Sequence, residues 1–239
     1  MRDLFIADAH LRDPQDLNYR KLLEFLDGQA GEIRTLYLLG DIFEFWIGRG
    51  FATFLPYQPL LDRLKQLRAA GTDIVYVEGN HDFYLAPYFA EKLGCTILPD
   101  GGEVTIDGKR VFLTHGDQIN PADVNYHRLR RFLRSGLIRF LSRVIPPDMI
   151  WRIATWGSRK SSESREGKTV RHIPLELLQA YARPHFDSGC QVMVSGHHHE
   201  AIFQKSETGT LVALGDWITD YSYAVCENGE FRLETYSAR

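Results

Sequence analysis

The chain has 239 residues, of which 44% are hydrophobic and 25% are charged, and its formal net charge is −3. This composition is typical of a soluble globular protein, and it excludes a membrane-spanning one because no apolar stretch approaches the roughly 18–20 residues of a bilayer span. Three widely spaced cysteines (Cys95, Cys190 and Cys226) argue against a disulfide framework and indicate a reducing compartment. Arg2 and Asp3 precede only a short apolar run, so we expect no signal peptide and a cytoplasmic protein.

The first third of the chain alternates predicted strands with predicted helices. Leu22, Phe25 and Leu26 recur at helical spacing in the first helix. Gly71 follows the second helix and is a normal stop signal. The expected order is strand, helix, strand, helix, strand, over about 2–7, 16–30, 35–39, 59–70 and 73–77.

The rest of the core is predicted to contain short strands and hairpins. A short helix around Tyr88 and Phe89 follows the third strand, and Asp107-Gly108 between two β-prone runs is a strong two-residue hairpin signal. Further strands are expected at about 191–194, 201–205 and 210–214, with a last hairpin around Asn228-Gly229. Alternating strands and helices followed by hairpins predict an α/β sandwich with mixed sheets.

The pattern changes between residues 121 and 172, where strand signals stop and helical spacing dominates. Residues 127–168 contain eleven Arg or Lys against three Asp or Glu, with apolar residues threaded between the basic ones. We interpret residues 121–172 as an inserted helical cap over a core formed by residues 1–120 and 173–239. The alternative interpretation is a charged, solvated helical face above an ordinary core stripe.

Asp, Asn and His residues recur where the predicted strands end. In open α/β sheets the site lies outside the carboxyl ends of the strands. We therefore expect one site built from five loops. The five motifs are Asp8-Ala9-His10, Gly40-Asp41, Gly79-Asn80-His81-Asp82, His115-Gly116-Asp117 and Gly196-His197-His198-His199.

These motifs supply candidate metal ligands of mixed oxygen and nitrogen type. The seven candidates are Asp8, His10, Asp41, Asn80, His115, His197 and His199. No thiolate lies among them, which excludes a structural zinc site of the cysteine kind. Seven ligands exceed the needs of one tetrahedral ion, but they suit two divalent ions roughly 3.5–4 Å apart that clamp the oxygens of a displacement at phosphorus. We favour Mn²⁺, and Fe and Zn also suit these ligands.

The ordered motifs D-x-H, G-D, G-N-H-D, H-G-D and G-H-x-H resemble those of the calcineurin-like metallophosphoesterases. The resemblance implies a four-layer α/β/β/α sandwich. It implies one metal ion on Asp8, His10 and His199, a second on Asn80, His115 and His197, and Asp41 bridging the two. In that family the histidine at the position of His81 protonates the leaving oxygen or stabilises charge on the phosphate, with Asp82 orienting it.

Loop 43–48, with the sequence FEFWIG, and the basic cap resemble those of the UDP-2,3-diacylglucosamine pyrophosphatases of lipid A biosynthesis. This resemblance implies hydrolysis of a UDP-sugar lipid to UMP and the lipid 1-phosphate. Arginines attract a diphosphate, and apolar faces receive acyl chains or rest on the inner membrane. The implied substrate contacts are Asn80, His81, Asp123, Tyr126, Ser161, Arg165, Lys168 and His197. The chain departs from the well-known members at His81, where they carry Arg.

Two other functions are compatible with the motifs. A phosphodiesterase or phosphatase acting on nucleotides or nucleic acid would grip phosphates with the basic cap. Aliphatic residues between the arginines favour lipid over nucleic acid, whose bases stack on exposed aromatic side chains. A non-catalytic scaffold of the same fold would show degenerate ligands, and all seven are present. We therefore predict a cytoplasmic hydrolase that contacts the inner membrane peripherally.

Overall fold

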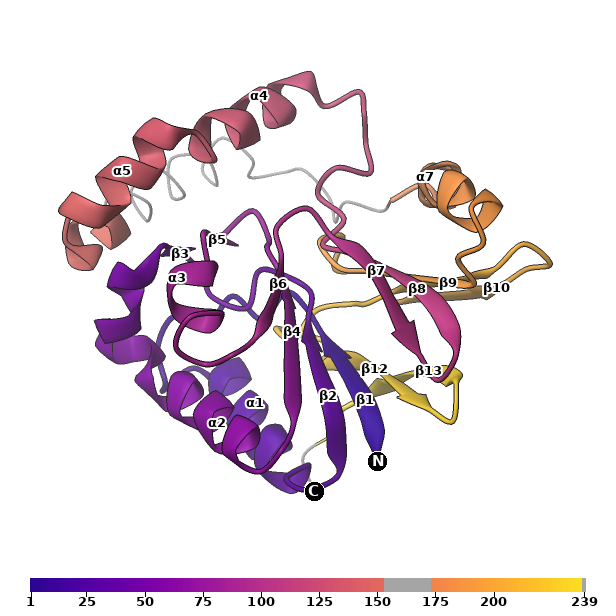
Figure 1. The fold of residues 1–239 in the computed structure, drawn as a ribbon, viewed down its shortest axis with the longest axis horizontal. Helices are drawn as coiled ribbons and strands as arrows, with labels where there is room; N and C mark the ends of the chain where they lie inside the picture. Colours follow the sequence, from indigo (N-terminus) through magenta and orange to yellow (C-terminus); the bar gives the residue numbers. More distant parts are fainter. Residues whose placement is uncertain (153–172, 238–239) are drawn as a thin grey trace.

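Two mixed β-sheets packed face to face form the centre of the structure, a computed structural model that describes residues 1–152 and 173–237 (Figure 1). The first sheet has the strand order β13-β12-β1-β2-β4-β6. Its strands are β1 (Arg2–Ile6), β2 (Ile33–Leu38), β4 (Asp73–Val77), β6 (Thr96–Leu98), β12 (Ser222–Glu227) and β13 (Glu230–Thr235). Because β1, β2, β4 and β6 run parallel, their carboxyl ends meet at one edge of the sheet.

The second sheet has the strand order β10-β11-β9-β8-β7. Its strands are β7 (Gly102–Ile106), β8 (Lys109–Thr114), β9 (Val192–Ser195), β10 (Ile202–Lys205) and β11 (Thr210–Ala213). Strands β8, β9 and β11 run parallel. The predicted hairpin joins β7 to β8, with Asp107 at φ 48° and Gly108 at φ 79°, the left-handed pair that a tight two-residue turn requires.

Helices cover the outer face of each sheet (Figure 1). Helices α1 (Leu17–Gly28) and α2 (Gln58–Ala69) pack on the first sheet through Leu22 and Leu64, and α7 (Leu175–Asp187) packs on the second through Leu178. A separate apolar cluster that includes Val77 and Val194 lies between the sheets. The expected four-layer α/β/β/α sandwich is therefore confirmed, and all three cysteines are buried free thiols within it.

Several small elements were not expected from the sequence. Strand β6 has only three residues, and the two-stranded sheet of β3 (Trp46–Ile47) and β5 (Asp82–Phe83) forms only when two distant loops meet. Helix α7 contains Pro184, a residue that normally argues against a helix. The chain also has 3-10 helices at Arg49–Thr53 and Leu55–Tyr57, whereas α3 (Ala86–Phe89) is the short helix that the sequence predicted around Tyr88 and Phe89.

Two helices from the predicted cap, α4 (Val124–Leu133) and α5 (Gly136–Val144), lie on the side of the sandwich to which β1, β2 and β4 point (Figure 1). Helix α4 begins where Asp123 accepts a hydrogen bond from the backbone N–H of Tyr126, at 3.1 Å. Leu133 and Ile138 pack against the core. Other large apolar side chains remain more than half exposed, namely Val124, Leu129, Phe132, Leu137, Phe140 and Val144.

Two arginines of this segment attach it to the loops below. Arg130 Nε lies 2.8 Å from a carboxylate oxygen of Asp117, after β8. Arg134 Nη1 lies 2.8 Å from the buried carboxylate of Glu78, and its Nη2 donates to the Gly79 carbonyl at 3.0 Å. Buried acids therefore attach the cap to two of the predicted motifs, Asp117 within one and Glu78 directly before the other.

We expect Arg134→Ala to destabilise the fold by about 3 kcal/mol, because it leaves the buried Glu78 carboxylate without its cation. Urea unfolding followed by circular dichroism measures the change. Arg128→Ala, an exposed change in α4, whose C-cap is Arg134, is the matched control and should stay within about 0.5 kcal/mol of the unmodified chain. Equal losses in the two variants would show that the Arg134–Glu78 pair does not stabilise the attachment.

Candidate metal centre

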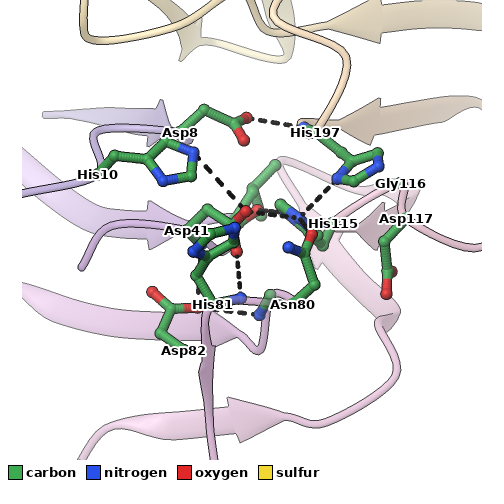
Figure 2. Close-up of polar contacts among 12 residues, drawn as sticks. Asp8, His10, Asp41, Asn80, His81, Asp82, His115, Gly116, Asp117 and His197 are labelled. Carbon is green, nitrogen blue, oxygen red and sulfur yellow. Dashed lines mark hydrogen bonds and ion pairs between the residues drawn. The ribbon is translucent and has the colours of Figure 1, made fainter. Parts of the chain in front are cut away.

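All seven candidate ligands lie in loops that follow parallel strands. Asp8 and His10 follow β1, Asp41 follows β2, Asn80 follows β4, His115 follows β8, and His197 and His199 follow β9. These loops from both sheets converge on one cluster (Figure 2). Within it, three groups each offer ligand atoms less than 4.8 Å apart: Asp8-His10-His199, His10-Asp41-His81 and Asp41-His115-His197.

Asp41 lies at the centre of the cluster (Figure 2). Its Oδ2 atom is 3.7 Å from Nε2 of His10 and 3.5 Å from Nε2 of His115. Its Oδ1 atom accepts a hydrogen bond from the backbone N–H of His81 at 2.9 Å. One carboxylate oxygen thus faces a histidine from each sheet, a placement that suits a carboxylate shared by two ions.

Asp8 is fully buried and keeps one carboxylate oxygen without a hydrogen-bond partner. Its Oδ2 accepts a hydrogen bond from the backbone N–H of His197 at 2.7 Å, whereas Oδ1, the unsatisfied atom, is 3.6 Å from Nε2 of His199. A buried carboxylate oxygen without a partner costs free energy. A divalent cation among Asp8, His10 and His199 would remove that cost, so this half of the site fits a metal ion.

Nitrogen and amide oxygen atoms converge in the other half of the site. Nε2 of His115 is 3.0 Å from Oδ1 of Asn80 and 3.2 Å from Nδ1 of His197. The opposite ring nitrogen of His115 contacts the Leu39 carbonyl at 2.8 Å, which leaves Nε2 turned toward the cluster. An amide oxygen and two imidazoles beside a carboxylate form a donor set that suits Mn²⁺, Fe²⁺ or Zn²⁺.

The charges of the cluster shift its pKa values in opposite directions. Burial acts to raise the pKa of Asp41, but the His115 and His81 rings outweigh it and hold the pKa well below its usual value. Burial acts to lower the pKa of His115, but Asp41 and Asp8 raise it to about 10. Burial and the neighbouring His115 together lower the pKa of His197 to about 3. The carboxylates therefore draw positive charge into the cluster.

Five of the seven candidates have a left-handed backbone conformation. They are Asp8 (φ 53°), His10 (φ 44°), Asp41 (φ 54°), His197 (φ 74°) and His199 (φ 55°). Each such conformation costs a residue with a side chain roughly 1–2 kcal/mol, and it persists only where the surrounding structure imposes it. Strain of this kind concentrated in one cluster is typical of a functional site.

The structure corrects the role expected for Asp82. The Asp82 carboxylate accepts hydrogen bonds, between 2.6 and 3.0 Å long, from the Tyr76 hydroxyl and the backbone N–H groups of Asp41, Ile42 and Gly79. The His81 ring instead contacts the carbonyl oxygen of Glu44 through Nδ1, at 2.8 Å. Glu44, not Asp82, therefore orients His81, because Asp82 is committed to the backbone of the two loops.

The candidate substrate contacts of the cap divide into two groups. The Tyr126 ring lies beside His197, with 6.3 Å between ring centroids, and its hydroxyl donates to Asp117. Asp123 caps α4 next to it. Asp117 turns away from Asp41 (Figure 2). The remaining three expected contacts, Ser161, Arg165 and Lys168, lie outside the described residues.

The structure places two buried carboxylates beside the cluster that we did not predict from the sequence. Glu44 Oε2 lies 3.5 Å from Nδ1 of His10, and Asp216 Oδ2 lies 3.4 Å from Nδ1 of His199. A signal existed for Asp216, because Gly215-Asp216 follows an apolar run just as Gly40-Asp41 does. Glu44 lies inside the aromatic loop 43–48, and no motif or spacing in the sequence distinguishes it as a candidate.

Known proteins with similar sequences decide the family. A family model described as calcineurin-like phosphoesterase matches residues 1–201. The UDP-2,3-diacylglucosamine hydrolase of Aeromonas salmonicida is 33% identical over 240 residues, covering 98% of this chain and 93% of that protein. The protein of the same name from Pseudomonas entomophila is 34% identical over 222 residues and covers 90% of each chain. This chain belongs to the calcineurin-like phosphoesterase family.

Solved structures agree with the fold of this phosphoesterase. An archaeal phosphodiesterase aligns over 99% of this chain and 100% of its own, with a TM-score of 0.52 at 16% identity. A hypothetical protein from Pyrococcus horikoshii aligns over 98% of this chain and 87% of its own, also with a TM-score of 0.52, at 13% identity. At such low identity the likeness concerns the fold alone.

Family membership makes the chain a metal-dependent phosphoesterase and implies a dinuclear divalent metal site. The orphaned oxygen of Asp8 and the mixed oxygen and nitrogen donors fit that expectation. Among the helices of residues 1–152 and 173–237, none has the length and apolar character to cross a bilayer.

Gly79→Ala should disrupt the cluster, because a Cβ atom at this position would overlap the Asp41 carboxylate and lie 2.8 Å from Oδ1 of Asp82. We expect a destabilisation of about 1–3 kcal/mol from overpacking, together with reduced metal content. Urea unfolding and elemental analysis by mass spectrometry measure both. Gly28→Ala is the matched control, since nothing lies within 4 Å of its added Cβ. Normal metal content in Gly79→Ala would contradict the close packing of the two loops.

Proposed function

We propose that this phosphoesterase hydrolyses the pyrophosphate bond of UDP-2,3-diacylglucosamine and releases UMP and the lipid 1-phosphate. The observation that carries the proposal is the extent of similarity to proteins named for this substrate. The similarity to the Aeromonas salmonicida protein spans 98% of the chain, too much to leave out the cap. The presence of all seven candidate ligands in one cluster supports hydrolysis over a scaffold role.

We assign the ligands by position in the cluster. One ion would bind Asp8, His10 and His199, a second would bind Asn80, His115 and His197, and Asp41 would be shared. Two bound divalent ions supply electrostatic stabilisation of the phosphoryl oxygens and lower the pKa of water. Mn²⁺ is our choice of ion on the basis of the mixed donors, which Fe and Zn also suit.

His81 acts on the leaving group in this proposal. The contact between its Nδ1 and the Glu44 carbonyl fixes the ring, and the ring lies edge-on to His10 with 4.8 Å between centroids. Nδ1 donates to that carbonyl. In the imidazolium form of the ring, Nε2 would also carry a proton, which it would give to the leaving phosphate oxygen, or whose charge would stabilise that oxygen. Asn80 and His197 would contact the same phosphates from the other side.

The cap provides the lipid and diphosphate contacts in this proposal. The exposed apolar side chains of α4 and α5, such as Leu137 and Phe140, receive acyl chains or rest on the inner membrane surface. Tyr126 and Asp123 lie at the end of α4 nearest His197, where the sugar diphosphate would enter. Ser161, Arg165 and Lys168 remain proposed contacts from the sequence. The enzyme would then act in the cytoplasm, in peripheral contact with the membrane.

Substrate comparison tests the proposed function. We expect Mn²⁺-dependent hydrolysis of UDP-2,3-diacylglucosamine to UMP, abolished by chelation, and much slower hydrolysis of UDP-glucosamine without acyl chains. Phe140→Asp should impair hydrolysis of the acylated substrate and leave a small chromogenic phosphodiester unaffected. Phe203→Asp, an exposed change on β10 outside the cap, is the control and should affect neither. Equal rates with and without acyl chains would make the enzyme a general nucleotide pyrophosphatase.

His81→Ala should lower turnover by about a hundredfold or more while leaving metal content intact, as expected for loss of an acid or charge stabiliser. Steady-state rates and elemental analysis measure the two effects. His81→Arg separates the two roles, since a guanidinium keeps the charge but does not give up a proton near neutral pH. Recovery of turnover in His81→Arg supports charge stabilisation, and loss of metal in His81→Ala would mean that His81 holds an ion.

A further inference from the structure

Two histidines of the cluster each lie between two carboxylates, with one carboxylate facing each ring nitrogen. Nε2 of His10 lies 3.7 Å from Oδ2 of Asp41, while its Nδ1 lies 3.5 Å from Oε2 of Glu44. Nε2 of His199 lies 3.6 Å from Oδ1 of Asp8, while its Nδ1 lies 3.4 Å from Oδ2 of Asp216. Both rings belong to the same proposed metal position, and both present Nε2 to it.

Asp216 is held firmly in the orientation that this contact needs. Its Oδ1 atom accepts hydrogen bonds from the backbone N–H groups of Ile218, Thr219 and Asp220, at 2.9, 2.7 and 3.2 Å. Only 6% of the residue is exposed. With Oδ1 occupied by the turn, Oδ2 lies 3.4 Å from Nδ1 of His199 and also accepts a hydrogen bond from the Thr219 hydroxyl at 3.2 Å.

Glu44 supports two rings with two different groups. Its carboxylate, in a residue that is 7% exposed, lies between Nδ1 of His10 and Nε of Arg12, the latter at 3.2 Å. Its backbone carbonyl contacts Nδ1 of His81 at 2.8 Å. A change of the Glu44 side chain therefore alters the partner of His10 and keeps the partner of His81.

The other proposed metal position is supported differently. His115 turns Nδ1 to the neutral Leu39 carbonyl, and His197 turns its own Nδ1 into the cluster, toward His115. Asp117, in the same H-G-D motif as His115, is paired with Arg130 at 2.8 Å and with the Tyr126 hydroxyl. The carboxylate supplied by that loop is thus neutralised by the cap.

We propose that Glu44 and Asp216 are positioning residues that make the Asp8–His10–His199 position bind its divalent ion more tightly than the Asn80–His115–His197 position does. A carboxylate that accepts a hydrogen bond from Nδ1 fixes the tautomer in which the Nε2 lone pair is free, and it makes the ring a stronger ligand. The proposal rests on the ligand assignment of the proposed function. Beyond that assignment, the two positions differ in affinity, so one ion is held tightly and the other exchanges more readily.

Equilibrium binding of Mn²⁺ to the metal-free full chain tests this inference. Electron paramagnetic resonance of free Mn²⁺ should show two ions binding to the unmodified protein in two steps of different affinity. Glu44→Gln and Asp216→Asn should each weaken the tighter step by about 10–100-fold and leave the weaker step unchanged.

Two further variants assign the steps and control for the loss of a buried charge. Asn80→Ala should keep the tighter step and lose the weaker one. Asp3→Asn removes a buried carboxylate that is paired with Arg34 at the opposite end of β1, and it should change neither step. If Asp216→Asn does not fold, Glu44→Gln decides the question, since the Glu44 carboxylate contacts side chains rather than a backbone turn.

The outcomes separate this inference from the proposed function. Two ions of equal affinity, or weakening of the second step alone in Glu44→Gln and Asp216→Asn, would overturn the inference and leave the hydrolase intact. A protein that binds fewer than two ions would instead overturn the ligand assignment itself. Selective weakening of the tighter step in both variants, with that step retained in Asn80→Ala, supports the inference.

Discussion

The fully buried carboxylate of Asp82 joins the loops that follow β2 and β4, and the cluster depends on this contact. It accepts hydrogen bonds from the backbone N–H groups of Asp41 and Gly79, so it sets the distance between the two loops. Burial and the neighbouring Asp41 charge raise the pKa of Asp82 to about 6. Hydrogen bonds from the backbone N–H groups and the Tyr76 hydroxyl offset part of the free-energy cost of burying the charged Asp82 carboxylate. If these loops separated, Asp41 would no longer lie between the histidines from the two sheets.

Three apolar clusters provide the stability that such a polar centre requires. They fill the spaces between the four layers and hold the strands in register. The polar side chains come after those strands, where the chain leaves the sheets and takes up left-handed conformations at five candidate ligands. The strain is local and the packing is distributed over the whole sandwich, so the fold tolerates an arrangement that the loops alone would not adopt.

Two basic residues of the cap have a structural role. Arg130 and Arg134 are engaged with the buried acids Asp117 and Glu78, so they attach α4 to the core and are not free cations over the site. Counting charges in the sequence therefore overstates the positive potential offered to a diphosphate. The same attachment neutralises Asp117 beside His115, which connects the cap to the unequal support of the two proposed metal positions.

The sequence alone indicated most of the longer strands, the first two helices and the seven candidate ligands, and the resemblance of its motifs indicated the layered fold. This was possible because a strand's apolar run and the residue that ends it are local properties of the chain. Only the tertiary structure decided the partners of Asp82, the contact of Glu44 with His10, and that of Asp216 with His199. The partners that come from different loops are 17 to 41 positions apart along the chain. Which of them meet depends on how two sheets pack, and spacing within one segment carries no information about that.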